Sequence, residues 1–301
     1  MTIGRISTIS VHQKTVSDIS RVQYEMGKIR SQISSGREAS DFKELGSKTI
    51  KVLDLESAIR GSNKFVKSND VAINRLKTMD LIATDITEIA RDMKSNIILE
   101  KSNSGSFDLK QFAENALKQL EGNLNKRDGN RAIFAGSKID GDAVGNLVHV
   151  SNVLDGVPTA NYYKGDAMTL SVKATSVLEI DYGINASDPA FTNLIGALHK
   201  AIELDNEGTE SSFQEASKFI DDALDGLVNI RSSINSDIIT LEGLNSQHLR
   251  FVQEFNSILS ETIGVDVVEA SINLSLNDAI LTATMQTFAK VSNLTLSDFL
   301  R

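Results

Sequence analysis

The sequence predicts a mainly α protein. Long antiparallel helical rods and a coiled coil would be built from both termini, with a small antiparallel β domain inserted in the middle. Only two prolines occur in the 301 residues, Pro158 and Pro189, and both lie near the middle. Proline costs about 3 kcal/mol inside a helix, so the stretches on either side can form uninterrupted helices. In these flanking stretches apolar residues recur at spacings of three and four, as on one face of a helix. Seven of the nineteen glycines instead lie in the middle, from Gly129 to Gly183.

The N-terminal part begins with a coiled-coil pattern. Its apolar residues follow the spacing three, four, three, four and are Ile19, Val22, Met26, Ile29 and Ile33. The small residues at 34–36 end this helix, and Ser40 and Asp41 can cap the next one. We then expect a long helical tract over about 43–100, a loop at 101–106 and a further helix over about 107–126.

The middle of the chain predicts a small antiparallel β insert. Two runs alternate between apolar and polar residues, with Met168, Leu170 and Val172 in the first and Leu178, Ile180 and Tyr182 in the second. Asp155-Gly156 and Gly165-Asp166 are turn dipeptides. Pro189 closes the insert.

Helical patterns return after the insert. We expect one helix from about 188 to 206 and a longer one over about 209–263. Gly243 and the polar stretch 245–248 are the expected weak point of the longer helix. Gly264 separates it from the last 37 residues.

The last stretch, 265–301, predicts a helix that cannot hide its apolar face alone. Every seventh residue is apolar at Val267, Leu274, Leu281 and Phe288, and Ile272, Leu276, Ala279 and Ala283 widen the face. We expect this face to pack on the seam that starts at Ile19. The expected packing surface also includes Leu294, Leu296 and Phe299.

Three domains follow from this order of elements. The terminal coiled-coil domain combines 1–42 with 264–301, and a helical rod domain combines 43–128 with 188–263. The β insert domain covers 129–187. The first sixty residues carry net positive charge and the last 37 net negative charge, which mildly favours pairing of the two ends.

Composition and spacing speak against several classes of function. The net charge is −9 and no basic block with aromatics occurs, so nucleic acid is not an expected partner. The chain has no cysteine and its four histidines are dispersed, which predicts no metal site and no cofactor. No nucleophile–base constellation or phosphate-binding loop supports an enzyme. The polar start does not read as a secretory signal, and no segment predicts a membrane span.

Short strings along the chain carry a resemblance to a known family. They are QISSGR at 32–37, DGNRAIFAGSK at 128–138, YKGD at 163–166 and TFAKVSNLTLSDFL at 287–300. In this order they resemble the flagellin family of bacterial axial proteins, most closely its hook-associated protein 3 type. Two departures occur: the Asp-Asp-Pro run usual after the first string is replaced by DFKE at 41–44, and a usual Gly-Ala step by Ser233-Ile234-Asn235.

The resemblance implies a secreted structural subunit of the bacterial flagellum and no enzyme. It would leave the cell through the flagellar type III channel and join the hook region to the filament. The implied partners are copies of itself in a ring, another hook-associated protein, flagellin and an export chaperone. Two alternatives stay open at this point: a filament flagellin, or a secreted helical needle-tip or effector protein of a virulence-type export system.

Overall fold

The computed structural model describes residues 3–39, 43, 45–102, 108–150, 162–207 and 209–299. It confirms a mainly α fold with a small antiparallel β element in the middle of the chain. The helices are α1 (Ile3–Ser35), α2 (Thr49–Ser102), α3 (Leu109–Leu124), α4 (Pro189–Glu207), α5 (Glu210–Ile263) and α6 (Val267–Phe299). A 3-10 turn, η2 (Gly46–Lys48), leads into α2.

The chain divides into two compact units. The first combines Met1–Arg60 with Phe251–Arg301, and the second is Gly61–Arg250. The long helices α2 and α5 therefore contribute to both units. The proposed three-domain division places its boundaries elsewhere, next to the interhelical connections, and stays a prediction.

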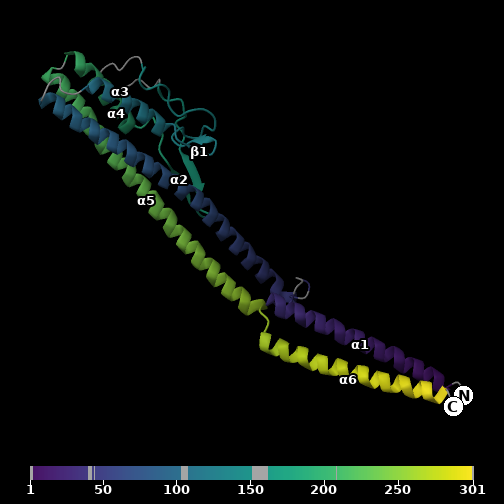
Figure 1. Cartoon of the computed structure of the whole chain (residues 1–301). Coiled ribbons are helices and arrows are strands. Elements are labelled where there is room, and N and C mark those ends of the chain that lie inside the picture. The colour runs from purple at the N-terminus through teal and green to yellow at the C-terminus, as the bar shows by residue number, and fades with distance from the viewer. Residues whose placement is uncertain are drawn as a thin grey trace. The chain divides into compact units, whose positions relative to one another are not determined.

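The first unit is built around the two terminal helices. Figure 1 shows α1 and α6 lying side by side, with the beginning of α1 next to the end of α6. The start of α2 and the end of α5 complete this unit. A small apolar cluster joins them to the connection between α1 and α2, and it consists of Ala39, Leu45, Val52, Leu259 and Ile263.

The second unit is built on the antiparallel pair of α2 and α5, shown in Figure 1. Ion pairs that join the two helices fix their direction: Lys77–Glu242 at 2.8 Å, Lys94–Asp221 at 2.6 Å and Lys101–Glu210 at 2.6 Å. From one ion pair to the next the residue number rises on α2 and falls on α5, so the two helices are antiparallel. The helices α3 and α4 pack on each other. One continuous core draws on all four helices and on the insert.

Apolar periodicity places the core residues of α2 and α3. The inward side chains of α2 include Met79, Ile82, Ile86, Met93 and Ile97, at the predicted spacings, and all are buried. On α3, Leu109, Ala116, Leu120 and Leu124 are buried as well. Asp108 caps α3, since its side chain accepts a hydrogen bond from the backbone N–H of Gln111 at 2.8 Å.

The insert contains two short hairpins. The strands β1 (Arg127–Asp128) and β2 (Arg131–Ala132) pair with each other, as do β3 (Leu170–Lys173) and β4 (Glu179–Tyr182). In the second hairpin Val172 and Tyr182 are buried while their polar neighbours are exposed, which is the predicted alternation. Pro158 and the turn Asp155-Gly156 lie outside the described residues.

Pro189 closes the insert and is also the first residue of α4, a position where its missing N–H costs nothing. The expected weak point of α5 at 245–248 is wrong, because α5 continues through it without a break. Asn245 and His248 are buried there and hydrogen-bonded.

Candidate functional site

The terminal helix pair, α1 with α6, contains the predicted packing residues. Met26 is buried at 5% exposure. The other seam residues are partly buried, namely Ile19, Val22, Ile29 and Ile33 on α1 and Leu274, Leu281 and Phe288 on α6. Val267 at the start of α6 is 48% exposed. The side chains of Leu294, Leu296 and Phe299 lie outside the described ones. Sequence analysis missed Ala270, which is buried although it lies between the predicted positions.

A ring contact fixes the pairing of the two helices far from the interhelical connections. The rings of His12 on α1 and Phe288 on α6 meet edge to face, with centroids 4.6 Å apart. A hollow of about 320 Å³ lies beside this contact. Its walls are formed by His12, Thr15, Asp18, Ala283, Thr284, Thr287 and Phe288. The seam is therefore thin at this end and leaves space between the helices.

Part of the apolar face of α6 that is expected to pack on α1 is left uncovered, including Ile272 and Leu276. Val268, Ile272, Leu276 and Ile280 follow each other at a spacing of four, so they share one winding face of the helix. Their exposed fractions lie between 42% and 71%. On α1, Val16 and Tyr24 are also exposed. Contiguous exposed apolar side chains mark surfaces that bind other proteins.

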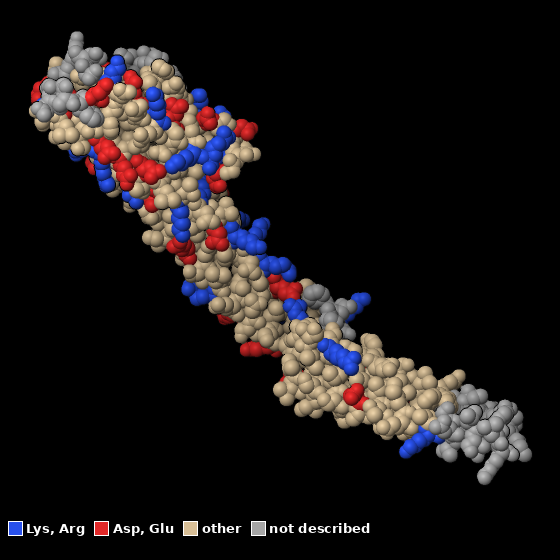
Figure 2. Space-filling view, in the orientation of Figure 1, with Lys and Arg blue, Asp and Glu red and all other residues tan. Residues whose placement is uncertain are grey.

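The surface of the terminal helix pair also differs from that of the second unit in its charge. Figure 2 shows few charged side chains over α1 and α6 on the visible face, whereas Lys, Arg, Asp and Glu crowd the face of the second unit. An interface core is depleted in charge relative to the rest of a protein surface. The visible face of the terminal helix pair has that composition.

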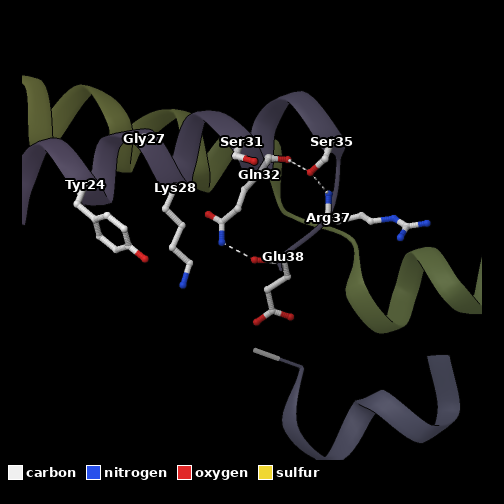
Figure 3. A pocket seen from close by; sticks show the side chains of 8 residues that line it. All are labelled: Tyr24, Gly27, Lys28, Ser31, Gln32, Ser35, Arg37 and Glu38. Carbon is white, nitrogen blue, oxygen red and sulfur yellow. Dashed lines mark hydrogen bonds between the residues drawn. The ribbon is translucent and has the colours of Figure 1, made fainter. Parts of the chain in front are cut away.

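The connection that follows α1 forms a compact turn. Gly36 has a φ of 69°, a left-handed conformation that glycine adopts without strain. Figure 3 shows the Ser35 hydroxyl between the carbonyl of Gln32 and the N–H of Arg37, and the Gln32 amide reaching the carbonyl of Glu38. These contacts give the string QISSGR a structural role as a helix-ending turn. A hollow of about 270 Å³ opens beside it, and Tyr24 and Gly27 line it from α1.

Polar side chains buried in the second unit were not predicted from the sequence. Asn69, Arg75 and His248 are buried on the long helices α2 and α5. The guanidinium of Arg75 donates to the carbonyls of Ala132 and Ile133 at 3.2 and 3.0 Å. Burial lowers the pKa of Arg75, because it removes water from the charged form. These residues tie the insert to the helices.

The described residues contain neither a metal site nor a membrane helix. Nowhere in the described part of the chain do three potential metal ligands come together. Likewise, none of the described helices combines the length with the apolar character that spanning a bilayer requires. His199 and His248 each bond a backbone carbonyl through Nε2, at 2.8 and 3.0 Å.

Comparisons with known proteins point to the bacterial flagellum. Residues 6–139 match the family model described as the bacterial flagellin N-terminal helical region. The fold is similar to a putative flagellar hook-associated protein from Vibrio parahaemolyticus, with 14% sequence identity, a TM-score of 0.58 and coverage of 72% of this chain and 97% of that chain. It is also similar to FlgL from Bacillus cereus, with 16% identity, a TM-score of 0.54 and coverage of 71% and 98%. No curated protein matches the sequence.

The family match confirms the resemblance to the flagellin family that the sequence strings indicated. At such low identity the two solved structures establish a shared fold. Family match and fold together indicate a structural protein of the bacterial flagellum.

Proposed function

We propose that this chain, whose residues 6–139 match the flagellin N-terminal helical region, is the junction subunit that links the hook-associated region to the flagellin filament. It would be exported through the flagellar type III channel and would assemble outside the cell as a ring of identical copies. Its further partners would be another hook-associated protein, flagellin and an export chaperone.

The observation that carries the proposal is the uncovered apolar surface of the terminal helix pair. The side chains of Ile272 and Leu276 on α6 are more than half exposed. Large apolar side chains of these types are more often buried in folded proteins. Burying one such side chain stabilises an interface by roughly 1.5–3 kcal/mol. Adjacent exposed apolar side chains of this kind fit a surface that neighbouring subunits would cover.

The proposed assembly residues form two sets on this pair. The first set would be the seam between the two helices of one subunit: Ile19, Val22, Met26, Ile29, Ile33, Val267, Leu274, Leu281 and Phe288. The second set would extend the contact toward the end of the chain through Leu294, Leu296 and Phe299. The stripe from Val268 to Ile280 would face the neighbouring subunit.

Two structural relatives support the junction role over a filament flagellin. One is a putative flagellar hook-associated protein and the other is FlgL. This chain spans nearly the whole length of each of those chains. The ending at 287–300 resembles the junction type as well. A needle-tip protein would need mainly its C-terminal helix, whereas here α1 and α6 form one paired element.

A variant series on the exposed stripe tests the proposal. Ile272→Asp combined with Leu276→Asp places two charges where a neighbouring subunit would pack, and burying unpaired charge is costly. We expect a folded monomer that fails to enter the flagellum. Asn273→Asp lies between them at an exposed polar position and serves as the matched control. Normal incorporation of the double variant would overturn the assigned surface.

A truncation tests the end of the chain in the same assay. Deleting Ser292–Arg301 should leave a folded protein, because the core of the second unit lies elsewhere. Incorporation into the flagellum should be lost. A truncated chain that assembles normally would count against a role for Leu294, Leu296 and Phe299.

A further inference from the structure

The two interhelical connections of the first unit are joined to each other through their backbones. The N–H of Glu38, after α1, donates to the carbonyl of Ile263 at 2.7 Å. The N–H of Val265, before α6, donates to the carbonyl of Gly36 at 3.1 Å. Arg37 and Gly264 form an isolated antiparallel bridge between these two bonds. We call Gly36, Arg37 and Glu38 with Ile263, Gly264 and Val265 the backbone staple.

We propose that the backbone staple makes α1 and α6 one moving body, which hinges as a pair on Gly36 and Gly264. Neither terminal helix can then turn relative to the ends of α2 and α5 unless the other turns with it. This property belongs to the free chain and does not depend on the assembly role proposed above.

Both pivots require glycine, for different physical reasons. Gly36 has a φ of 69°, which a residue with a Cβ adopts only at a cost, although open space surrounds the position. At Gly264 the backbone N–H donates to the carbonyl of Ser260 at 2.7 Å. An added Cβ at Gly264 would lie 2.2 Å from that same carbonyl oxygen, so a side chain must displace the backbone.

Contacts on both sides anchor the staple. Toward α1, the N–H of Gly36 donates to the carbonyl of Gln32 at 2.8 Å, and the Gln32 amide binds the Glu38 carbonyl. Toward α2, Arg37 pairs with Glu56 at 3.3 Å and Lys48 with Glu38 at 2.8 Å. These ion pairs are exposed and individually weak.

The apolar packing below the staple is the firmer anchor. Ile263 and Ala39 flank the staple and belong to the buried cluster that includes Val52 and Leu259. The staple is therefore held on a packed base, while α1 and α6 extend from it on glycine pivots. A single connection can rotate freely about its φ and ψ angles. Two connections that share hydrogen bonds lose that independence, because turning one breaks the bonds of the other.

Correlated hydrogen exchange of two amides tests this inference on the full chain. The amides of Glu38 and Val265 should be protected in the wild type and should open together, as groups in one cooperative unit do. Gly36→Ala and Gly264→Ala should each lower the protection of both amides by about tenfold. Gly27→Ala is the matched control, because Gly27 has an ordinary helical φ and open space around it. It should leave both amides unchanged.

If Gly264→Ala exposes only Val265 and leaves Glu38 protected, the connections move independently and the inference is wrong. Unprotected amides in the wild type would overturn it too. Should Gly264→Ala fail to fold, Gly36→Ala still decides, since nothing lies within 4 Å of its added Cβ.

A distance measurement provides a second readout of the same coupling. The chain has no cysteine, so spin labels can be placed at single engineered sites. Gln23→Cys on α1 and Asp278→Cys on α6 lie at exposed positions. We expect a narrow distance distribution in the otherwise unchanged chain and in Gly27→Ala, and a broader one in Gly36→Ala. An unchanged distribution in both staple variants would refute the coupling.

Discussion

The side-chain amide of Asn69 on α2 donates to the side-chain oxygen of Asn245 on α5, 2.9 Å away in the core of the second unit. The same Asn69 amide also lies 3.4 Å from the carbonyl of Ala174, which follows β3. His248 donates to that carbonyl from one turn further along α5, and its ring stacks on Phe65. Two helices and the β insert therefore meet at one buried polar cluster.

The Asn69–Asn245 pair should show strong energetic coupling. Asn69→Leu or Asn245→Leu alone leaves a buried polar partner unsatisfied, which costs about 1–3 kcal/mol of the free energy of unfolding. The double variant should lose less than the sum of the two, because it removes both partners. Urea unfolding of the four proteins measures this. Asn74→Leu, at an exposed position on α2, should change stability by less than about 0.5 kcal/mol. Strictly additive losses would contradict the pairing.

Arg75 should hold the first hairpin of the insert on α2. Arg75→Met keeps much of the apolar stem and removes the donors to the carbonyls of Ala132 and Ile133. Hydrogen bonds from a charged group contribute about 1.5–3 kcal/mol, so we expect a loss of that size in the urea unfolding free energy. Arg91→Met, at an exposed position of α2, is the control. An equal and small effect of both variants would argue against the anchor.

Tyr163 should make the protein sensitive to strong base. Burial, with the nearby Asp166 charge, raises the pKa of Tyr163 to about 12, above the ordinary value near 10. The folded state therefore holds this proton more tightly than the unfolded state. The associated stability is complete below about pH 10 and is lost as the pH rises toward 12.

Burial also raises the pKa values of Tyr162 and Tyr182. Tyr163 therefore accounts for only part of the loss of stability at high pH. Urea midpoints between about pH 9 and about pH 12 measure it. Tyr163→Phe should flatten the profile, and Tyr24→Phe, at an exposed position, should keep the wild-type profile. A wild-type profile in Tyr163→Phe would contradict the assignment.

Hydrogen exchange should divide the monomer into weakly and strongly protected parts. Among the described side chains of α1 and α6, only Met26 and Ala270 are buried. The second unit, in contrast, has a continuous core. We therefore expect weak protection over 1–35 and 266–301 and strong protection over 45–125 and 210–260. Strong protection at both ends of a verified monomer would show that the terminal helices do not need neighbours.

The fold could be predicted from the sequence where the apolar pattern was regular. The three-four spacing predicted the buried face from Met79 to Ile97, and the alternation around Val172 and Ile180 predicted the second hairpin. Pro189 marked the end of the insert, where α4 begins. Such patterns report which face of an element is buried, and they located the core face of α2 and α3.

The buried polar cluster could not be predicted, because its burial is set by neighbours distant in sequence. Asn69 and Asn245 resemble solvent-exposed helix residues until Ala174 is placed between their helices. The polar stretch 245–248 likewise predicts a weak point in α5, because the sequence does not show that Ala174 accepts a hydrogen bond from His248. The predicted seam on α1 and α6 stays a prediction of the assembly surface.

The central claim, that this chain joins the hook region to the filament, is tested most directly by a deletion strain. Cells lacking the protein should make intact hooks without filaments and should shed unassembled flagellin into the medium. The full-length gene should restore filaments, and the Ile272→Asp and Leu276→Asp double variant should not. Filaments of normal length on cells without the protein would contradict the claim.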